Sequence, residues 1–328
     1  MARSLLQVQD LHTHFFTREG VVKAVNGVSF SLYPGRVLGL VGESGCGKTV
    51  TALSILRLVP YPGRVVGGHI YYEGRDLLAL SGEEMRRLRG KEISVVFQDA
   101  QASLNPILPA GLQVEEVLHA HTRMSKGAAR ERAADLLEEV GLPDPYQVMD
   151  RYPFQLSGGM AQRVMLAISL ALGPRVLIAD EPTTGLDVTL QADFLVRLKR
   201  LQQERGMAVL LITHDMGVIA STADEVAVIY AGRIVEFAEV RELFRRPLHP
   251  YTWGLFRALP RLDRPDAPLY PVRGTPPNLV DLPDQCPFLP RCPKATSTCR
   301  LNPMPPLEEA ALGHRVACYN PIHEGEAP

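Results

Sequence analysis

Two apolar runs that end abruptly in polar residues give the sequence its clearest pattern. They are RVLIADEP at residues 175–182 and AVLLITHD at residues 208–215. Continuous apolar runs of this length are typical of central parallel strands, which are buried on both faces and present polar groups at their carboxyl ends. RVLGLVG at 36–42 and ISVVFQD at 93–99 are further strand candidates. The pattern predicts an α/β protein with a parallel core.

Other stretches alternate or follow a helical period. Residues 5–16 alternate as a half-exposed strand does, and residues 226–237 predict a hairpin around an Ala-Gly turn. Helices are expected at residues 49–59, 127–141 and 159–173, where apolar positions recur among good helix formers.

The composition changes near Arg246. Seventeen of the 27 prolines fall in residues 247–328, and proline is excluded from long helices and central strands. The same segment carries Trp253, Phe256 and Phe288, so it is not a polar low-complexity tail. We expect an irregular but ordered appendage that needs a cross-link to stay folded.

Charge and hydropathy exclude some classes of protein. The 35 basic and 36 acidic residues nearly balance, which gives no support to a nucleic-acid binder. No secretion signal is visible, and no apolar run approaches the roughly 18 residues that span a bilayer. We expect a cytosolic protein that, if it works at a membrane, docks onto the helices of other proteins.

The first chemical motif is the stretch GESGCGKT. It matches G-x-x-x-x-G-K-[ST], the phosphate-binding loop, and lies between an apolar strand and a helix as that loop requires. Glycines let backbone N–H groups curl around an anion, the lysine meets the terminal phosphates, and the threonine hydroxyl can ligate Mg²⁺. The candidate nucleotide-binding residues are Gly42, Ser44, Gly45, Cys46, Gly47, Lys48, Thr49 and Val50. Small-molecule kinases, GTPases and motor ATPases share this loop, so it indicates a nucleotide and not a function.

Polar residues at three strand ends add candidates for hydrolysis. Asp180 could reach Mg²⁺, and Glu181 could polarise the water that attacks the γ-phosphate. Gln98 could touch Mg²⁺ or that water, and His214 could hydrogen-bond the γ-phosphate. The plain alternatives are an acidic strand cap, a surface glutamine and a structural histidine.

A second serine-glycine stretch, Leu156-Ser157-Gly158-Gly159-Met160, precedes a helix expected to begin near Ala161. It is either another anion-binding helix start or a simple N-cap with flexible glycines. A chain that binds one nucleotide seldom needs two phosphate-binding sites, unless each site binds the nucleotide of a different subunit.

Together these motifs resemble one family, the ATP-binding cassette (ABC) ATPases. The phosphate loop, glutamine, LSGG signature, Asp-Glu strand end, Gly185-Leu186-Asp187 loop and histidine appear in that family's order over roughly residues 5–250. The resemblance implies a P-loop NTPase cassette at residues 1–246, with a mixed sheet core, an antiparallel β subdomain and a helical subdomain at about residues 100–157.

The resemblance also implies roles for individual residues. Two cassettes would pack head to tail, so that Ser157, Gly158 and Gly159 serve the partner's ATP and Asp187 bridges the two sites. Glu181 would be the general base, His214 would hold the γ-phosphate, and Thr49, Gln98 and Asp180 would face Mg²⁺. Phe15 would stack on adenine, with Phe16 as the neighbouring candidate. Met160 departs from the family's usual glutamine, and methionine cannot hydrogen-bond as glutamine does.

Four of the five cysteines crowd into the end of the chain as Cys286-x5-Cys292-x6-Cys299-x18-Cys318. In a cytosolic chain such a cluster favours metal over disulfides, although the paired C-x₂-C knuckles of common zinc sites are missing. Four thiolates suit zinc or an iron–sulfur cluster equally, and buried free thiols are the remaining alternative.

Three further stretches narrow the resemblance to the ATPase subunits of oligopeptide/dipeptide importers. They are SGGMAQRV in the signature, HPYT at His249–Thr252, and CPF-x-x-RC in the tail. This resemblance implies a C-terminal extension at residues 247–328 that holds a [4Fe–4S] cluster on Cys286, Cys292, Cys299 and Cys318, with Zn²⁺ as the alternative and a structural role.

The expected function is therefore ATP hydrolysis that energises peptide uptake from the cytoplasmic face of the cell membrane. The implied partners are a second cassette (a paralogue or another copy), two integral membrane permeases and an external solute-binding protein, with no nucleic acid. The alternatives are import of nickel or another small solute, and a cassette ATPase that acts outside transport.

Overall fold

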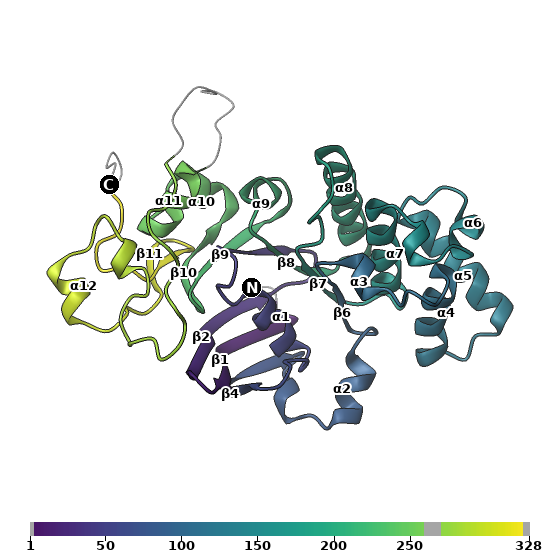
Figure 1. Cartoon of the computed structure of the whole chain (residues 1–328), viewed down its shortest axis with the longest axis horizontal. Helices are drawn as coiled ribbons and strands as arrows, with labels where there is room; N and C mark the ends of the chain where they lie inside the picture. The colour runs from purple at the N-terminus through teal and green to yellow at the C-terminus, as the bar shows by residue number, and fades with distance from the viewer. Residues whose placement is uncertain (1–2, 259–269, 324–328) are drawn as a thin grey trace. The chain divides into compact units, whose positions relative to one another are not determined.

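The structure is a computed structural model that describes residues 3–258 and 270–323. The chain passes repeatedly between two compact units (Figure 1). The helical unit comprises Met1–Leu6, Leu32–Val37 and Tyr72–Ile212, and the loop unit comprises Gln7–Ser31, Leu38–Tyr71 and Thr213–Pro328.

Three parallel strands form the core of the helical unit. β7 (Val176–Asp180) lies between β6 (Ile93–Val96) and β8 (Ala208–Thr213), with Val176 opposite both Ile93 and Ala208. Every residue of β7 and β8 is buried, which confirms the two central parallel strands predicted from their continuous apolar runs.

Helices cover the rest of this unit. They are α2 (Gly82–Leu88), α3 (Ala100–Ser103), α4 (Ala110–His121), α5 (Lys126–Glu139), α6 (Pro145–Met149), α7 (Gly158–Leu170) and α8 (Val188–Arg205). A two-residue strand, β5 (Arg75–Asp76), precedes them. The helices α4, α5, α6 and α7 pack on one another as one group. α5 and α7 match the sequence prediction, whereas α8, the longest helix among the described residues, was not predicted.

One sheet of the loop unit has the strand order β11-β12-β10-β9-β3. These are β3 (Val37–Val41), β9 (Glu225–Tyr230), β10 (Arg233–Glu239), β11 (Glu308–Ala311) and β12 (His314–Val316). β3 pairs with β9 in parallel, and β9 and β10 form the predicted hairpin, whose turn residues Ala231 and Gly232 both have positive φ. A second sheet holds β1 (Leu6–Thr17), β2 (Gly20–Leu32) and β4 (Gly63–Tyr72) in the order β2-β1-β4.

The helices of the loop unit are short: α1 (Lys48–Ile55), α9 (Met216–Thr222), α10 (Val240–Arg245), α11 (Pro250–Arg257) and α12 (Ser297–Leu301). α1 ends four residues before the predicted limit at residue 59, because Arg57 takes a positive φ of 53° that no helix accommodates. Within residues 3–258 and 270–323 no helix has the length and apolar character to cross a bilayer.

The proline-rich tail is more regular than its composition suggests. Besides α11 and α12 it forms the 3₁₀ turn η3 (Leu289–Arg291) and the hairpin β11–β12. β12 pairs antiparallel with β10, so the end of the chain joins the sheet of the loop unit. The domain limits at residues 246 and 247 stay a prediction.

Candidate functional site

The predicted phosphate loop joins β3 to α1 in the loop unit. Its glycines are needed because other backbone segments approach closely. A Cβ on Gly42 would lie 2.2 Å from the Ile229 carbonyl oxygen, and a Cβ on Gly47, whose φ is +105°, would lie 2.2 Å from that of Ala24. The Cys46 carbonyl also accepts a hydrogen bond from the Gly232 N–H at 2.9 Å. The sheet and the hairpin therefore hold the shape of the loop.

Lys48 lies at the start of α1 and is only 5% exposed. Its Nζ donates to the carbonyl oxygens of Gly42 at 2.8 Å and Glu43 at 3.0 Å. Ser44, Gly45 and Thr49 are exposed, so the loop presents a hydroxyl and glycine backbone to solvent while the lysine charge is bound to the loop carbonyls. Burial raises the pKa of the neighbouring Cys46 thiol, which keeps this side chain neutral.

Two residues of the tail also contact the loop, and no pattern in the sequence predicts either contact. Arg291 forms a forked ion pair with the Glu43 carboxylate, at 2.8 Å and 3.1 Å. The Tyr251 hydroxyl accepts a hydrogen bond from the Glu43 N–H at 2.9 Å, and burial raises the pKa of this phenol. Tyr251 belongs to the motif HPYT and Arg291 to the motif CPF-x-x-RC. In the sequence both motifs indicated only a resemblance to a family.

The helical unit brings two of the predicted hydrolysis residues together. Glu181 follows β7 directly, takes a positive φ of 45°, and is fixed by its N–H donating to the Ile212 carbonyl at 2.8 Å. Its Oε2 accepts hydrogen bonds from Gln98 Nε2 at 3.0 Å and from Thr184 Oγ1 at 3.0 Å. The pairing of Gln98 with Glu181 follows from the parallel strands that precede them, whereas Thr184 was not a candidate.

The predicted magnesium ligands are spread over both units. Asp180 ends β7 and is 3% exposed, and Gln98 is exposed after β6. Thr49 belongs to the loop unit. No group of three or more His, Cys, Asp or Glu side chains in the described part of the chain is arranged as a metal site. Hydroxyl, carboxylate and amide oxygens are nevertheless the donors that Mg²⁺ prefers.

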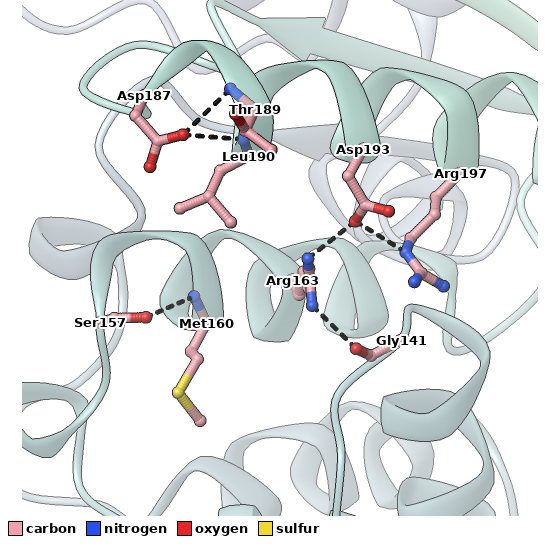
Figure 2. Close-up of polar contacts among 9 residues, drawn as sticks. All are labelled: Gly141, Ser157, Met160, Arg163, Asp187, Thr189, Leu190, Asp193 and Arg197. Carbon is pink, nitrogen blue, oxygen red and sulfur yellow. Dashed lines mark hydrogen bonds and ion pairs between the residues drawn. The ribbon is translucent and has the colours of Figure 1, made fainter.

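The serine-glycine stretch forms the start of α7 (Figure 2). Ser157 is the N-cap, and its Oγ accepts from the Met160 N–H at 3.3 Å. Asp187 caps α8 in the same way, with Oδ1 accepting from the N–H groups of Thr189 and Leu190 at 3.0 Å each. A Cβ on Gly159 would lie 3.2 Å from Leu190 Cδ1, so the two helix starts are in close contact.

An arginine network joins the same two helices one turn further on (Figure 2). Arg163 of α7 donates to Asp193 of α8 at 2.7 Å and to the Gly141 carbonyl at 2.8 Å. Arg197 donates to the same Asp193 oxygen at 3.0 Å. α7 and α8 are thus connected by ion pairs as well as by packing, a connection that the sequence motifs do not predict.

The remaining nucleotide candidates lie in the loop unit. His214 is exposed after β8 and precedes Asp215, whose carboxylate caps α9. Phe15 is half-buried in β1, where a Cβ on Gly63 would lie 2.6 Å from its ring. Phe16 is 40% exposed, and the Arg64 guanidinium lies 4.4 Å from its ring centroid. The roles of His214 and Phe15 stay predictions.

The four tail cysteines are partly buried free thiols. Burial and the neighbouring thiols raise the pKa of Cys286 to about 11 and that of Cys318 to about 12, and burial also raises the pKa of Cys292. The thiols therefore lie within electrostatic range of one another, but in the described part of the tail they are not arranged as metal ligands. The predicted iron–sulfur or zinc site has no support from this geometry.

Comparison with known proteins supports both the predicted cassette and the predicted C-terminal extension as regions similar to known families. Residues 25–184 match the family model for ABC transporters, and residues 235–299 match that for the C-terminal region of oligopeptide/dipeptide transporters. The chain is 49% identical to the dipeptide transport ATP-binding protein DppD of Bacillus subtilis, over 90% of this chain and 88% of the relative. It is 46% identical to the oligopeptide transport ATP-binding protein OppD of Salmonella typhimurium, over 98% of this chain and 96% of the relative.

Solved structures support the fold. The dimeric, post-hydrolysis ABC cassette MJ0796 bound to ADP and phosphate is similar with a TM-score of 0.66 and 28% identity, over 72% of this chain and 99% of that one. CbiO1 of Clostridium perfringens, part of the transporter complex cbiONQ, is similar with a TM-score of 0.63 and 25% identity, over 74% of this chain and 91% of that one. The predicted cassette fold is confirmed, and the chain belongs to the ABC transporter family, among the ATP-binding proteins of its oligopeptide/dipeptide branch.

Proposed function

We propose that this protein is the ATP-hydrolysing subunit of an ABC importer for di- or oligopeptides. The observation that carries the proposal is the phosphate loop, built at a strand-to-helix junction with Lys48 held against its carbonyls. Relatives named as dipeptide and oligopeptide transport ATP-binding proteins, matched over nearly the whole chain, support the choice of peptides.

In this proposal each residue has a chemical task. Backbone N–H groups of the phosphate loop and the Lys48 ammonium bind the β- and γ-phosphates. Glu181 accepts a proton from the attacking water, and Gln98 orients that carboxylate until the water is bound. His214 donates a hydrogen bond to the γ-phosphate, and Phe15 stacks on the adenine. Thr49, Asp180 and Gln98 would hold Mg²⁺, which neutralises part of the phosphate charge.

A second cassette completes the site. Ser157, Gly158 and Gly159 bind the ATP of the partner subunit, and Asp187 joins the two sites. ATP closes the pair because its phosphates are fully bound only when both faces meet, and hydrolysis lets the subunits part. Two membrane permeases convert this movement into transport from the cytoplasmic face, and an external binding protein delivers the solute.

For the four tail cysteines, the only support for a metal site is that thiols are suitable ligands. Four thiols are the ligand set that the sequence resemblance assigns to a [4Fe–4S] cluster, or alternatively to Zn²⁺. Anaerobic purification followed by iron, sulfide and zinc analysis tests this. Matched iron and sulfide would establish a cluster, stoichiometric zinc would replace it, and absence of all three would leave the tail as buried thiols.

Glu181→Gln tests the hydrolytic mechanism. Loss of the base is expected to lower kcat by about 10²–10⁴-fold while ATP still binds and stabilises a dimer. Glu204→Gln is a matched control, because Glu204 is 57% exposed and contacts Arg200 on the surface of α8. Normal turnover in Glu181→Gln would rule out this base.

Uptake assays test the solute class. Vesicles that hold the chain with its permeases and binding protein should accumulate labelled di- or tripeptides in an ATP-dependent manner. Uptake of labelled nickel without peptide uptake would reassign the solute. A chain that never sediments with membranes would favour a cassette ATPase outside transport.

A further inference from the structure

A phosphate loop binds anions with backbone N–H groups and a lysine, yet this loop contains a carboxylate. Glu43 lies between Gly42 and Ser44, and its side chain is only 23% exposed. A fixed negative charge at this position opposes the binding of a polyphosphate. The chain therefore needs a compensating charge, and the structure shows where it comes from.

That charge is Arg291, 248 residues further along the chain. The side chain of Arg291 is 6% exposed and engages both carboxylate oxygens of Glu43 in the forked geometry that a guanidinium favours. The remaining bonds go to the Tyr230 hydroxyl at 3.1 Å and to the carbonyls of Arg273 and Val272 at 2.9 Å and 3.3 Å. Five bonds match the five N–H donors of arginine, so the guanidinium is fully hydrogen-bonded: two bonds reach the loop, one reaches β9 and two stay within the tail.

Aromatic packing fixes the segment that carries Arg291. Phe288 is 1% exposed and its ring lies 5.3 Å from that of Tyr230 and 5.4 Å from that of Tyr251. The turn η3 is wound by N–H groups of Leu289 and Arg291 donating to the carbonyls of Cys286 and Phe288. The Tyr251 hydroxyl in turn accepts the Glu43 N–H, so side chain and backbone of Glu43 are both held by the tail.

We propose that Arg291 is a positioning residue for nucleotide binding: it neutralises Glu43 inside the phosphate loop and so makes ATP affinity depend on the folded C-terminal tail. The inference rests on the proposed function, because it assumes that the loop binds ATP. Arg291 contacts no nucleotide itself and acts through Glu43.

The test measures the affinity of the full-length protein for trinitrophenyl-ATP in the presence of Mg²⁺. It also measures the KM and kcat of ATP hydrolysis. Arg291→Met leaves the Glu43 charge uncompensated and is expected to weaken nucleotide binding about tenfold, about 1.4 kcal/mol, with the change in KM larger than that in kcat. The same substitution in a Glu43→Gln background should change affinity less than about threefold, because no charge is left to compensate. High salt should shrink the defect of Arg291→Met by screening the repulsion.

Asp284→Asn is the matched control. Asp284 forms another ion pair between the tail and the sheet, with Arg233 at 2.9 Å, and among the described residues its hydrogen bonds go to Arg233 and Met304 and not to the loop, so affinity should be unchanged. If Arg291→Met does not fold, Arg291→Lys keeps the charge with fewer donors, and its smaller defect must likewise vanish with Glu43→Gln.

Unchanged affinity in Arg291→Met would overturn the inference. Equal weakening with and without Glu43→Gln would also overturn it, since the effect would then come from tail packing and not from charge. Failure of the wild-type chain to bind ATP at all would instead overturn the proposed function, so the two failures are distinct.

Discussion

Glu236 of β10 offers the sharpest test of how the tail is anchored. Its side chain is 0% exposed, and its carboxylate accepts three hydrogen bonds. The donors are the N–H groups of Leu248 at 2.7 Å and His249 at 2.9 Å, and Nε2 of His314 at 2.8 Å. The first two lie just before α11, and the third lies in β12, so one buried carboxylate ties two separate parts of the tail to the sheet.

Replacing Glu236 with leucine keeps the side-chain size but leaves three buried donors without their acceptor. Removing one partner of a buried charged network costs about 3–5 kcal/mol, because the groups left behind are neither solvated nor bonded. At about 2–4 °C per kcal/mol for large domains, Glu236→Leu should lower Tm by roughly 10 °C. Glu236→Gln keeps one oxygen acceptor and should cost about half as much.

Thermal unfolding and hydrogen exchange together measure this effect. Exchange should rise first in residues 248–252, since two of the lost bonds come from backbone N–H groups there. Arg86→Met is a suitable control, because it breaks a fully exposed i,i+3 ion pair on α2 that contributes little. A Glu236→Leu protein within 1 kcal/mol of wild type, with unchanged exchange at 248–252, would refute the reasoning.

Three further predictions follow from single contacts. Thr184→Val removes one hydrogen bond to Glu181 and should lower kcat about tenfold at unchanged ATP affinity, whereas Thr184→Ser should retain activity in the same steady-state assay. Arg163→Met should cost about 1–2 kcal/mol in urea unfolding, because Asp193 keeps Arg197 while the Gly141 carbonyl loses its donor; an unchanged midpoint would show that the network is not stabilising. Burial lowers the pKa of His249 to about 3, and its Nδ1 accepts the Tyr251 N–H, so the folded state keeps this imidazole neutral. Unfolding then takes up a proton below about pH 6.5, so the free energy of unfolding should fall as the pH drops, and at pH 5 it should be about 2 kcal/mol lower than at pH 7. In urea titrations at pH 7 and pH 5, His249→Asn should reduce this difference.

The parallel core and the local motifs could be predicted because their signals are local. β7 and β8 are continuous apolar runs buried on both faces, and the hairpin turn is marked by its Ala-Gly pair. Since parallel strands end at the same edge, the pairing of Gln98 with Glu181 also follows from sequence. α8 was missed although Phe194, Leu198 and Leu201 form a buried stripe at helical spacing, so in that case the signal was present.

The contacts made by the tail were not predictable in the same way. Its short helices and hairpin depend on partners far along the chain, such as Glu236 for the turn before α11. Proline content correctly indicated that long helices are absent from the described tail, but it carries no information on pairing. No pattern in a single sequence links Arg291 to Glu43, because the two residues come together only through the finished fold.

The distance in sequence between those two residues also has a consequence for biosynthesis. At roughly 5–20 residues per second, the ribosome makes Arg291 roughly 10–50 s after Glu43, the 248-residue separation setting this delay. Until then the nascent chain lacks β12 and the arginine that compensates the loop carboxylate. The unit that carries the phosphate loop can therefore reach its final form only after β12 has been made, so a chain terminated before that point would be both incompletely folded and poorly suited to bind ATP.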